Sequence, residues 1–209
     1  LFIKCVRDDE EPTHTRVQQK VVHAGGFENL LPTLYELVQR ELAASAKPGA
    51  RPFKAIVYFN STAEVALANT ILRELDSTRN GSLYPARIFD IHGKLSQMQR
   101  TRASDSFRKA KSGILLSSDV TARGLDFPDV THVVQVGLPN QRDQYIHRIG
   151  RTARAGKEGE GWLILSDLER REFRSRLGGL PLQPDDSLET PKVDMSREAQ
   201  LPENVANIL

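Results

Sequence analysis

Short apolar runs alternate with longer amphipathic segments through most of this chain. Five runs are dominated by apolar residues: AIVYF (55–59), ARIFDI (86–91), GILLSSD (113–119), THVVQVG (131–137) and GWLILS (161–166). Continuous apolar runs of this length are typical of strands that are covered on both faces. Another strand is predicted near the beginning, where THTRVQQKVV (13–22) alternates polar and apolar residues.

The segments between these runs have the spacing of helices. From Phe27 to about Ala44, apolar residues recur at helical intervals. Two more helices are expected to begin at capping boxes, STAE at 61–64 and SQMQ at 96–99, where two residues satisfy each other's free amides. Three side chains of the second helix are expected to point inward: Met98, Ala103 and Phe107. Short helices are also predicted near 143–149 and from Asp167.

Strands that alternate with helices predict an α/β fold, with a mostly parallel sheet and helices on both faces. Ligands of such sheets bind beyond the carboxyl ends of the strands. Four segments should therefore meet at one edge: 60–62, 92–94, 118–126 and the stretch that follows residue 140. The apolar pattern ends near Leu177, and a short helix is possible at 198–209. We expect a linker remnant at 1–12, one domain at 13–176, and the start of an extension at 177–209.

Composition and charge narrow the possible sites. The chain of 209 residues has a net charge of only +2, so an anion site must be local rather than a property of the whole molecule. A single cysteine, Cys5, excludes an internal disulfide and a multi-cysteine zinc site. No apolar run approaches the length of a membrane span. The chain begins LFIKCVRDDEE without methionine, so we expect it to be a piece of a longer protein.

The segment YIHRIGRTARAG (145–156) is the best candidate for a local anion site. Residues 141–157 contain five arginine and lysine side chains and one aspartate, a local charge of +4. A charge run is most often a solvated helix face, but two features favour phosphate binding. Gly150 and Gly156 stand where an exposed helix would favour alanine or glutamate. Three arginines, whose planar forks suit phosphate, recur at every third position and are therefore expected to project to a similar side: Arg148, Arg151 and Arg154.

Two self-sufficient phosphate chemistries are excluded. A cysteine phosphatase needs a cysteine in the same loop, and Cys5 is far away in the sequence. The chain contains no GxxxxGK[ST] loop that could cradle a nucleotide. The acidic run DDEE (8–11) is interpreted as a solvated linker rather than a magnesium site, and no metal ligand is predicted. The arginines therefore form half of a site, completed by a nucleotide held on another domain.

Four stretches, in this order and at these intervals, resemble the motifs of the carboxyl-terminal RecA-like domain of DEAD-box RNA helicases: AIVYFNST, HGKLSQMQR, SSDVTARGLDFPDV and YIHRIGRTARAG. The match spans roughly 17–168. The phrases LDFPDV and RTARAGKEG, with the trailing extension, look most like the fungal mitochondrial members that help group I and group II introns fold and splice. The resemblance implies a RecA-like fold and a full-length ATP-dependent RNA helicase. It also implies a mitochondrial matrix location, with nucleus or cytoplasm as alternatives.

The resemblance further implies roles for individual residues. Two arginine fingers would reach the γ-phosphate of ATP: Arg151 and Arg154. Two residues would approach the rest of the nucleotide, the second toward the ribose: Gly124 and Asp126. Three would contact the partner domain: Arg123, His147 and Arg148. Five would grip single-stranded or structured RNA through its backbone: Ser61, Thr62, Gly93, Arg100 and Ser118. ATP with Mg²⁺ would be held mainly by the absent amino-terminal RecA-like domain, so this chain alone is expected to be inactive.

Simpler roles stay open for some of these residues. Ser61 is also a plain helix cap, Gly93 a plain turn, and Asp119 a residue that could only cap the loop carrying Arg123. The chain departs from the family pattern where Ala153 replaces a glycine and Ser118 replaces a threonine, and both changes are expected to be tolerated. Three other functions also stay open: an RNA-binding module without a nucleotide role, a scaffold domain, and half of a related DNA helicase.

Overall fold

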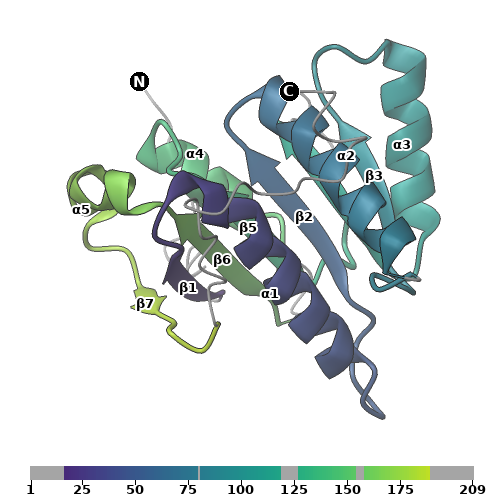
Figure 1. Cartoon of the computed structure of the whole chain (residues 1–209), viewed down its shortest axis with the longest axis horizontal. Helices are drawn as coiled ribbons and strands as arrows, with labels where there is room; N and C mark the ends of the chain where they lie inside the picture. Colours follow the sequence, from purple (N-terminus) through teal and green to yellow (C-terminus); the bar gives the residue numbers. More distant parts are fainter. Residues whose placement is uncertain (1–16, 80, 119–126, 154–157, 189–209) are drawn as a thin grey trace, which may run out of the picture.

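The strands form one sheet in which every described pairing is parallel (Figure 1). The computed structural model describes residues 17–79, 81–118, 127–153 and 158–188. The sheet order is β3-β4-β2-β5-β6-β1-β7. The strands are β1 (Gln18–His23), β2 (Lys54–Phe59), β3 (Arg87–Ile91), β4 (Gly113–Ser118), β5 (His132–Val136), β6 (Glu160–Leu165) and β7 (Leu182–Pro184). The predicted α/β fold with a parallel sheet is confirmed.

The helices begin close to the predicted positions because local interactions mark their starts. They are α1 (Leu30–Ser45), α2 (Thr62–Thr78), α3 (Gln97–Lys109), α4 (Arg142–Ile149) and α5 (Arg170–Leu177), with 3-10 turns η2 (Phe27–Asn29) and η5 (Asp167–Glu169). Both predicted capping boxes are confirmed. In each, the serine hydroxyl accepts the backbone N–H three residues later, and the side chain of that later residue accepts the serine N–H. Among the described helices, none is long and apolar enough to cross a bilayer.

Two apolar layers enclose the sheet. On one face α1 and α2 pack against side chains that include Phe59 and Trp162, both nearly inaccessible to solvent. On the other face Phe107 of α3 and Tyr145 of α4 pack against the alternate residues of the strands. Successive side chains of a strand point to opposite faces of the sheet. Because helices cover both faces, almost every position of β2, β4, β5 and β6 is buried, and their apolar runs are therefore continuous.

One predicted inward position of α3 is wrong. Met98 is 61% exposed, whereas Phe107 is fully buried and Ala103 packs partly against the core. Nine residues separate Met98 from Phe107, and at 3.6 residues per turn this separation places them on opposite sides of the helix. Ala103 and Phe107 are four residues apart and therefore share a face.

The sequence after Leu177 contains a strand that the apolar pattern did not predict. β7 pairs with β1 in parallel at the edge of the sheet, and the Asp185 N–H donates to the carbonyl of Val21 at 2.9 Å. Leu188 follows and is buried in the layer that includes α1. The predicted linker at 1–12 and the predicted helix near 198–209 lie outside the described residues.

Candidate functional site

The loops that follow β2, β3, β4 and β5 start at the same edge of the sheet. These four strands are parallel and adjacent, so their carboxyl ends lie together. Asn60 follows β2, His92 follows β3, and Ser118 ends β4. The helix α4, which carries the first part of the arginine segment, comes after β5. The predicted convergence is confirmed for 60–62, 92–94 and Ser118, while 119–126 lies outside the described residues.

Arg148 connects two of these strand ends from inside the domain. Its side chain lies on α4 and only 2% of the residue is exposed. The two terminal nitrogens donate to Asn60 Oδ1 at 3.5 and 3.4 Å, to Gln135 Oε1 at 3.3 Å and to the carbonyl of Phe59 at 3.4 Å. The guanidinium also lies over the Tyr58 ring, 5.2 Å from its centroid. The sequence predicted an interdomain contact for Arg148, but each of these bonds stays within the domain.

Arg151 has a different environment because the helix has already ended. α4 stops at Ile149, and Arg151 lies in the following turn with a partly exposed side chain. Its N–H donates to the carbonyl of Arg148 at 3.1 Å, and the hydroxyl of Thr152 donates to the carbonyl of Val130 at 2.9 Å. Helical spacing therefore does not continue from Arg148 to Arg151, and the two arginines differ in exposure. The backbone of Arg151 is fixed on both sides.

Ala153 adopts a backbone conformation that favours glycine. Its φ is +54°, in the left-handed region, and the residue is 8% exposed. This geometry gives a physical reason for the glycine that the family pattern has at this place, because only glycine enters the left-handed region without a Cβ clash. The chain accommodates alanine here.

Several predicted residues lie outside the described part of the chain. They are Arg123, Gly124, Asp126 and Arg154 of the predicted nucleotide and interdomain sets, and the loop residue Asp119. Within the described part, His147 is exposed on α4 and Arg151 lies in the turn after it. The next residue, Thr152, contacts Val130 and Gly159, which come just before β5 and β6, so the described end of the arginine segment lies toward the amino edge of the sheet and not at the expected carboxyl edge. The roles of all these residues stay predictions.

The five predicted RNA-binding residues follow β2, β3 and β4 and differ in accessibility. Ser61 and Gly93 are exposed, and Thr62 and Arg100 are partly exposed. Ser61 is also the N-cap of α2, so its hydroxyl already accepts the Glu64 N–H at 3.2 Å. Ser118 is only 4% exposed. Four of the five are therefore accessible at the carboxyl edge, and Ser118 is covered.

Asn60 begins the predicted edge segment 60–62, but the sequence reasoning gave it no role of its own, and it is a central residue of this edge. Its side-chain amide donates to the carbonyl of Leu138 at 2.9 Å, while its oxygen accepts from Arg148. Glu169 has a similar bridging role, since it accepts the Leu138 N–H at 2.6 Å and the Ser166 N–H at 2.9 Å. A polar residue directly after a fully apolar strand was the available signal for Asn60.

Tyr145 is a structural residue rather than an acid or base. Burial raises the pKa of Tyr145 above its ordinary value. Its hydroxyl donates to Gln19 Oε1 at 2.9 Å, and the residue is completely buried. The phenol therefore stays protonated and links α4 to β1.

Comparison with known proteins places this geometry in a family. The model of the helicase conserved C-terminal domain matches residues 34–156. The chain belongs to this family. The mitochondrial ATP-dependent RNA helicase mss116 of Aspergillus fumigatus is 50% identical over 207 residues, which cover 98% of this chain and 32% of the relative. The mitochondrial ATP-dependent RNA helicase cyt-19 of Neurospora crassa is 50% identical over 194 residues, 92% of this chain and 30% of the relative.

Solved structures agree with this assignment. Mss116p DEAD-box helicase domain 2 bound to an RNA duplex has a TM-score of 0.71 at 30% identity, with 92% of this chain and 73% of that chain covered. Mss116p bound to ssRNA and AMP-PNP has a TM-score of 0.71 at 31% identity, with 96% and 39% covered. The helicase domain described here has the RecA-like fold, and it spans about a third of the length of these curated relatives.

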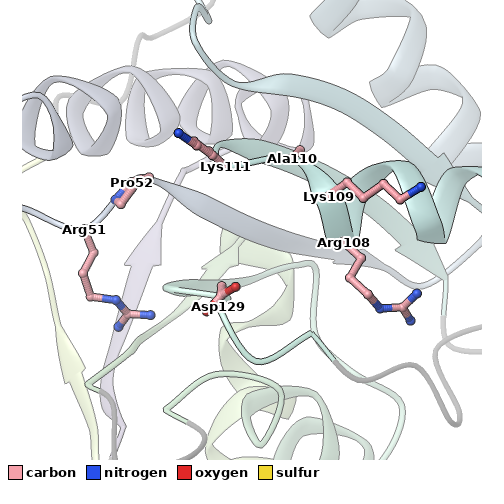
Figure 2. A pocket seen from close by; sticks show the side chains of 7 residues that line it. All are labelled: Arg51, Pro52, Arg108, Lys109, Ala110, Lys111 and Asp129. Carbon is pink, nitrogen blue, oxygen red and sulfur yellow. The ribbon is translucent and has the colours of Figure 1, made fainter.

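A basic hollow of about 250 Å³ lies at the opposite edge of the helicase domain (Figure 2). It is lined by Arg51, Pro52, Arg108, Lys109, Ala110, Lys111 and Asp129. The ammonium of Lys54 donates to the carbonyl of Arg108 at 3.1 Å, at the carboxyl end of α3, and burial lowers the pKa of Lys54. Cations are favoured at such a helix end. Helix electrostatics therefore accounts for the basic residues around this hollow.

One group of three side chains in the described helicase domain has atoms suited to hold a metal: Glu41, His132 and Glu160. His132 and Glu160 are the first residues of β5 and β6, so the group lies at the amino edge of the sheet. The group lies on the α1 face of the sheet, opposite the face that α4 covers, and the sequence reasoning did not identify it.

Proposed function

We propose that this chain is the second RecA-like domain of a DEAD-box ATP-dependent RNA helicase or RNA chaperone. Arg151 and Arg154 act as arginine fingers toward an ATP that is held, with Mg²⁺, mainly by the amino-terminal domain of the same protein. The observation that carries the proposal is the contrast between two neighbouring arginines. Arg148 is fixed inward, while Arg151 is partly exposed on a backbone held by the turn that follows α4.

Fixing Arg151 in advance suits transition-state stabilisation. A finger must meet the charge that develops on the transferred phosphoryl group, and a fixed backbone reduces the reorganisation needed at that moment. Gly124 and Asp126 complete the nucleotide contacts from this domain, and Arg123 and His147 contact the other domain. The nucleotide analogue in the related structure of Mss116p supports this arrangement.

RNA binding is assigned to four accessible residues at the carboxyl edge, Ser61, Thr62, Gly93 and Arg100. The covered residue Ser118, at the end of β4, completes the set. Hydroxyl, backbone and guanidinium groups of this kind contact phosphates and sugars and do not read base identity. The RNA-bound structures of Mss116p support the assignment. The chain therefore binds RNA without strong sequence preference.

The decisive experiment mixes this chain with a purified amino-terminal helicase domain and measures ATP hydrolysis with and without RNA. We expect RNA-dependent hydrolysis from the mixture and none from either part alone. Arg151→Ala should reduce the rate by about 10³-fold or more, the typical contribution of an arginine finger. Arg142→Ala, on the exposed side of α4, is the matched control and should hydrolyse ATP normally.

The outcome also separates the rival functions. An RNA-binding module without a nucleotide role predicts that Arg151→Ala weakens RNA affinity, whereas the helicase proposal predicts lost hydrolysis with RNA affinity largely kept. A DNA helicase predicts stronger stimulation by DNA than by RNA. ATP hydrolysis by the highly purified chain alone, lost in Arg151→Ala, would contradict the assignment of the nucleotide to another domain. A scaffold domain predicts a stable mixture with no hydrolysis.

The location proposed is the mitochondrial matrix, with a role in intron splicing. Support comes from the names of the relatives in Aspergillus fumigatus and Neurospora crassa, both called mitochondrial. Expression of the fluorescently tagged full-length protein tests the location directly. A nuclear or cytoplasmic signal would contradict it.

A further inference from the structure

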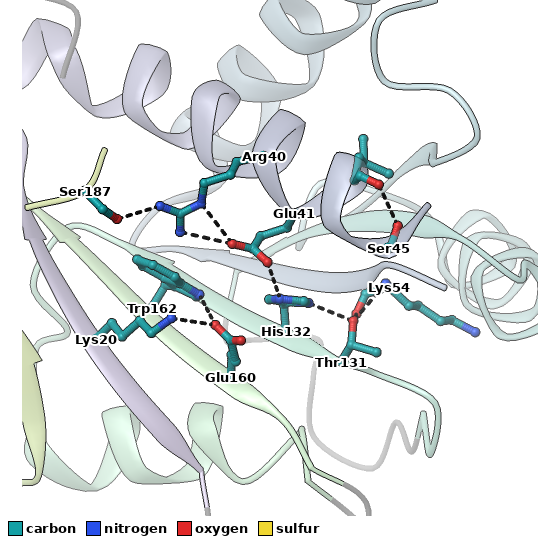
Figure 3. A network of polar contacts seen from close by, with 11 residues as sticks. Lys20, Arg40, Glu41, Ser45, Lys54, Thr131, His132, Glu160, Trp162 and Ser187 are labelled. Carbon is teal, nitrogen blue, oxygen red and sulfur yellow. Dashed lines mark hydrogen bonds and ion pairs between the residues drawn. The ribbon is translucent and has the colours of Figure 1, made fainter. Parts of the chain in front are cut away.

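Three side chains that are far apart in the sequence meet at the amino edge of the sheet (Figure 3). Glu41 comes from α1, His132 is the first residue of β5, and Glu160 is the first residue of β6. His132 and Glu160 are register partners on adjacent strands, so their side chains leave the same face of the sheet, toward α1. One ligand atom from each residue lies within 4.8 Å of the other two.

Each of these side chains is oriented from behind by another residue. Arg40 binds Oε1 of Glu41 at 3.0–3.1 Å, and Lys20 binds Oε2 of Glu160 at 3.1 Å. On the ring of His132, Nδ1 lies 2.8 Å from the hydroxyl of Thr131. Metal-binding histidines and carboxylates are commonly held by such outer partners, which fix the ring and the carboxylate in place.

Three atoms are left facing one another. The described hydrogen bonds use Oε1 of Glu41 and Oε2 of Glu160, which leaves the second oxygen of each carboxylate. Nε2 of His132 is buried and has no hydrogen bond among the described residues, although Glu41 Oε2 lies 3.4 Å away. The contact between Nε2 and Glu41 is long for a hydrogen bond, so a cation held between the three side chains would satisfy the ring nitrogen better and stabilise the cluster.

The alternative is a self-contained polar network. A proton on Nε2 would form a weak ion pair with Glu41, and Lys20 and Arg40 would neutralise the two carboxylates. This reading accounts for the charges and pairs Nε2 with Glu41, but it gives Glu160 no contact with the ring. A metal uses all three ligand atoms at once.

We propose that Glu41, His132 and Glu160 bind a divalent transition metal ion, with Zn²⁺ as the best match. One imidazole and two carboxylates are suitable zinc ligands, and three protein ligands leave a fourth position for water. That position faces an open hollow of about 720 Å³, which these three residues line together with Gly49 and Ala50. Lys20 and Arg40 lie close enough to repel the ion and lower its affinity.

The bound ion ties α1 to the first residues of β5 and β6. The site lies on the face of the sheet that α1 covers, whereas α4 and the arginine segment cover the other face. It is therefore a stabilising site that is independent of the proposed helicase function. Metal binding and helicase function can therefore be tested separately.

The test uses this chain with Cys5→Ser, so that the one cysteine cannot contribute a thiolate. Co²⁺ is titrated in, its visible absorption is followed, and Zn²⁺ is then added to displace it. We expect a saturable one-to-one spectrum that Zn²⁺ removes, and a higher melting temperature with Zn²⁺. His132→Ala should weaken binding at least about 100-fold, and Thr131→Val, which removes the outer partner, about 10- to 100-fold.

Controls separate a metal site from a loss of folding. Glu160→Gln keeps the shape of the side chain and should also weaken binding at least tenfold, with an unchanged far-ultraviolet circular dichroism spectrum. His23→Gln removes another partly buried histidine and should bind as the parent does. Absence of a saturable spectrum, or a spectrum that keeps its affinity in both His132→Ala and Glu160→Gln, would overturn the proposal.

Discussion

Replacing Arg148 by methionine tests whether this arginine belongs to the interior of the domain. Methionine keeps most of the apolar stem but loses the four described hydrogen bonds to the ends of β2 and β5. These bonds measure 3.3–3.5 Å, longer than ideal, so each is assigned about 0.5–1 kcal/mol. Together they predict a loss of about 2–4 kcal/mol in the free energy of unfolding.

For a domain of this size, that loss corresponds to a fall in melting temperature of about 5–15 °C. Differential scanning calorimetry of Arg148→Met and of Arg142→Met measures it. Arg142 lies exposed on the same helix and, among the described residues, its side chain makes one hydrogen bond, to the carbonyl of Gly178. Its variant should therefore differ from the parent by less than about 1 kcal/mol. If Arg148→Met melted within 2 °C of the parent, on the order expected of a surface substitution, the interior role would be refuted.

Three further predictions concern single positions. Ser61→Ala and Ser96→Ala remove equivalent helix caps, and each should lower the free energy of unfolding in urea by about 1 kcal/mol. Only Ser61→Ala should also weaken RNA binding in an anisotropy titration. Equal RNA affinities of the two variants would contradict the role of Ser61. Burial, followed by the charge of Arg170, lowers the pKa of His23, although Asp167 and Asp186 oppose this shift. The unfolded chain therefore binds a proton at higher pH than the folded chain, and the stability of the domain should fall as the pH decreases below about 6.5. In thermal melts, His23→Gln should reduce the dependence of the melting temperature on pH in this range. An unchanged dependence would argue against the role of His23. Ala153→Val should destabilise the domain by about 1–3 kcal/mol because β-branched residues disfavour a positive φ. Ala153→Gly should stay within about 1 kcal/mol of the parent. Similar melting temperatures for the two variants would argue against backbone strain at this position.

The strands and helix starts could be predicted because their causes are local. The run AIVYF is apolar throughout because both faces of β2 are covered, and each capping box is complete within four residues. The alternation of these elements then determined the parallel sheet and its ligand edge. β7 escaped prediction because it has three residues and depends on pairing with β1 rather than on its own pattern.

The details of the site depend on contacts between distant residues, which the sequence does not display. Equal spacing of Arg148 and Arg151 suggested one shared direction, but α4 ends between them and sends them to different environments. The burial of Ser118 likewise follows from its place in a central strand. His132 and Glu160 are separated by 28 positions and meet only because β5 and β6 are neighbours in register.

The bond between Arg148 and Asn60 has a consequence for how two ligands influence each other. Asn60 precedes Ser61, a proposed RNA contact, and Arg148 lies three residues before Arg151, the proposed phosphate contact. A shift of the arginine segment toward a nucleotide would be passed through this bond to the residue that precedes the N-cap of α2. Linkage is reciprocal, so whatever factor the nucleotide imposes on RNA affinity through this connection, RNA imposes on nucleotide affinity in return.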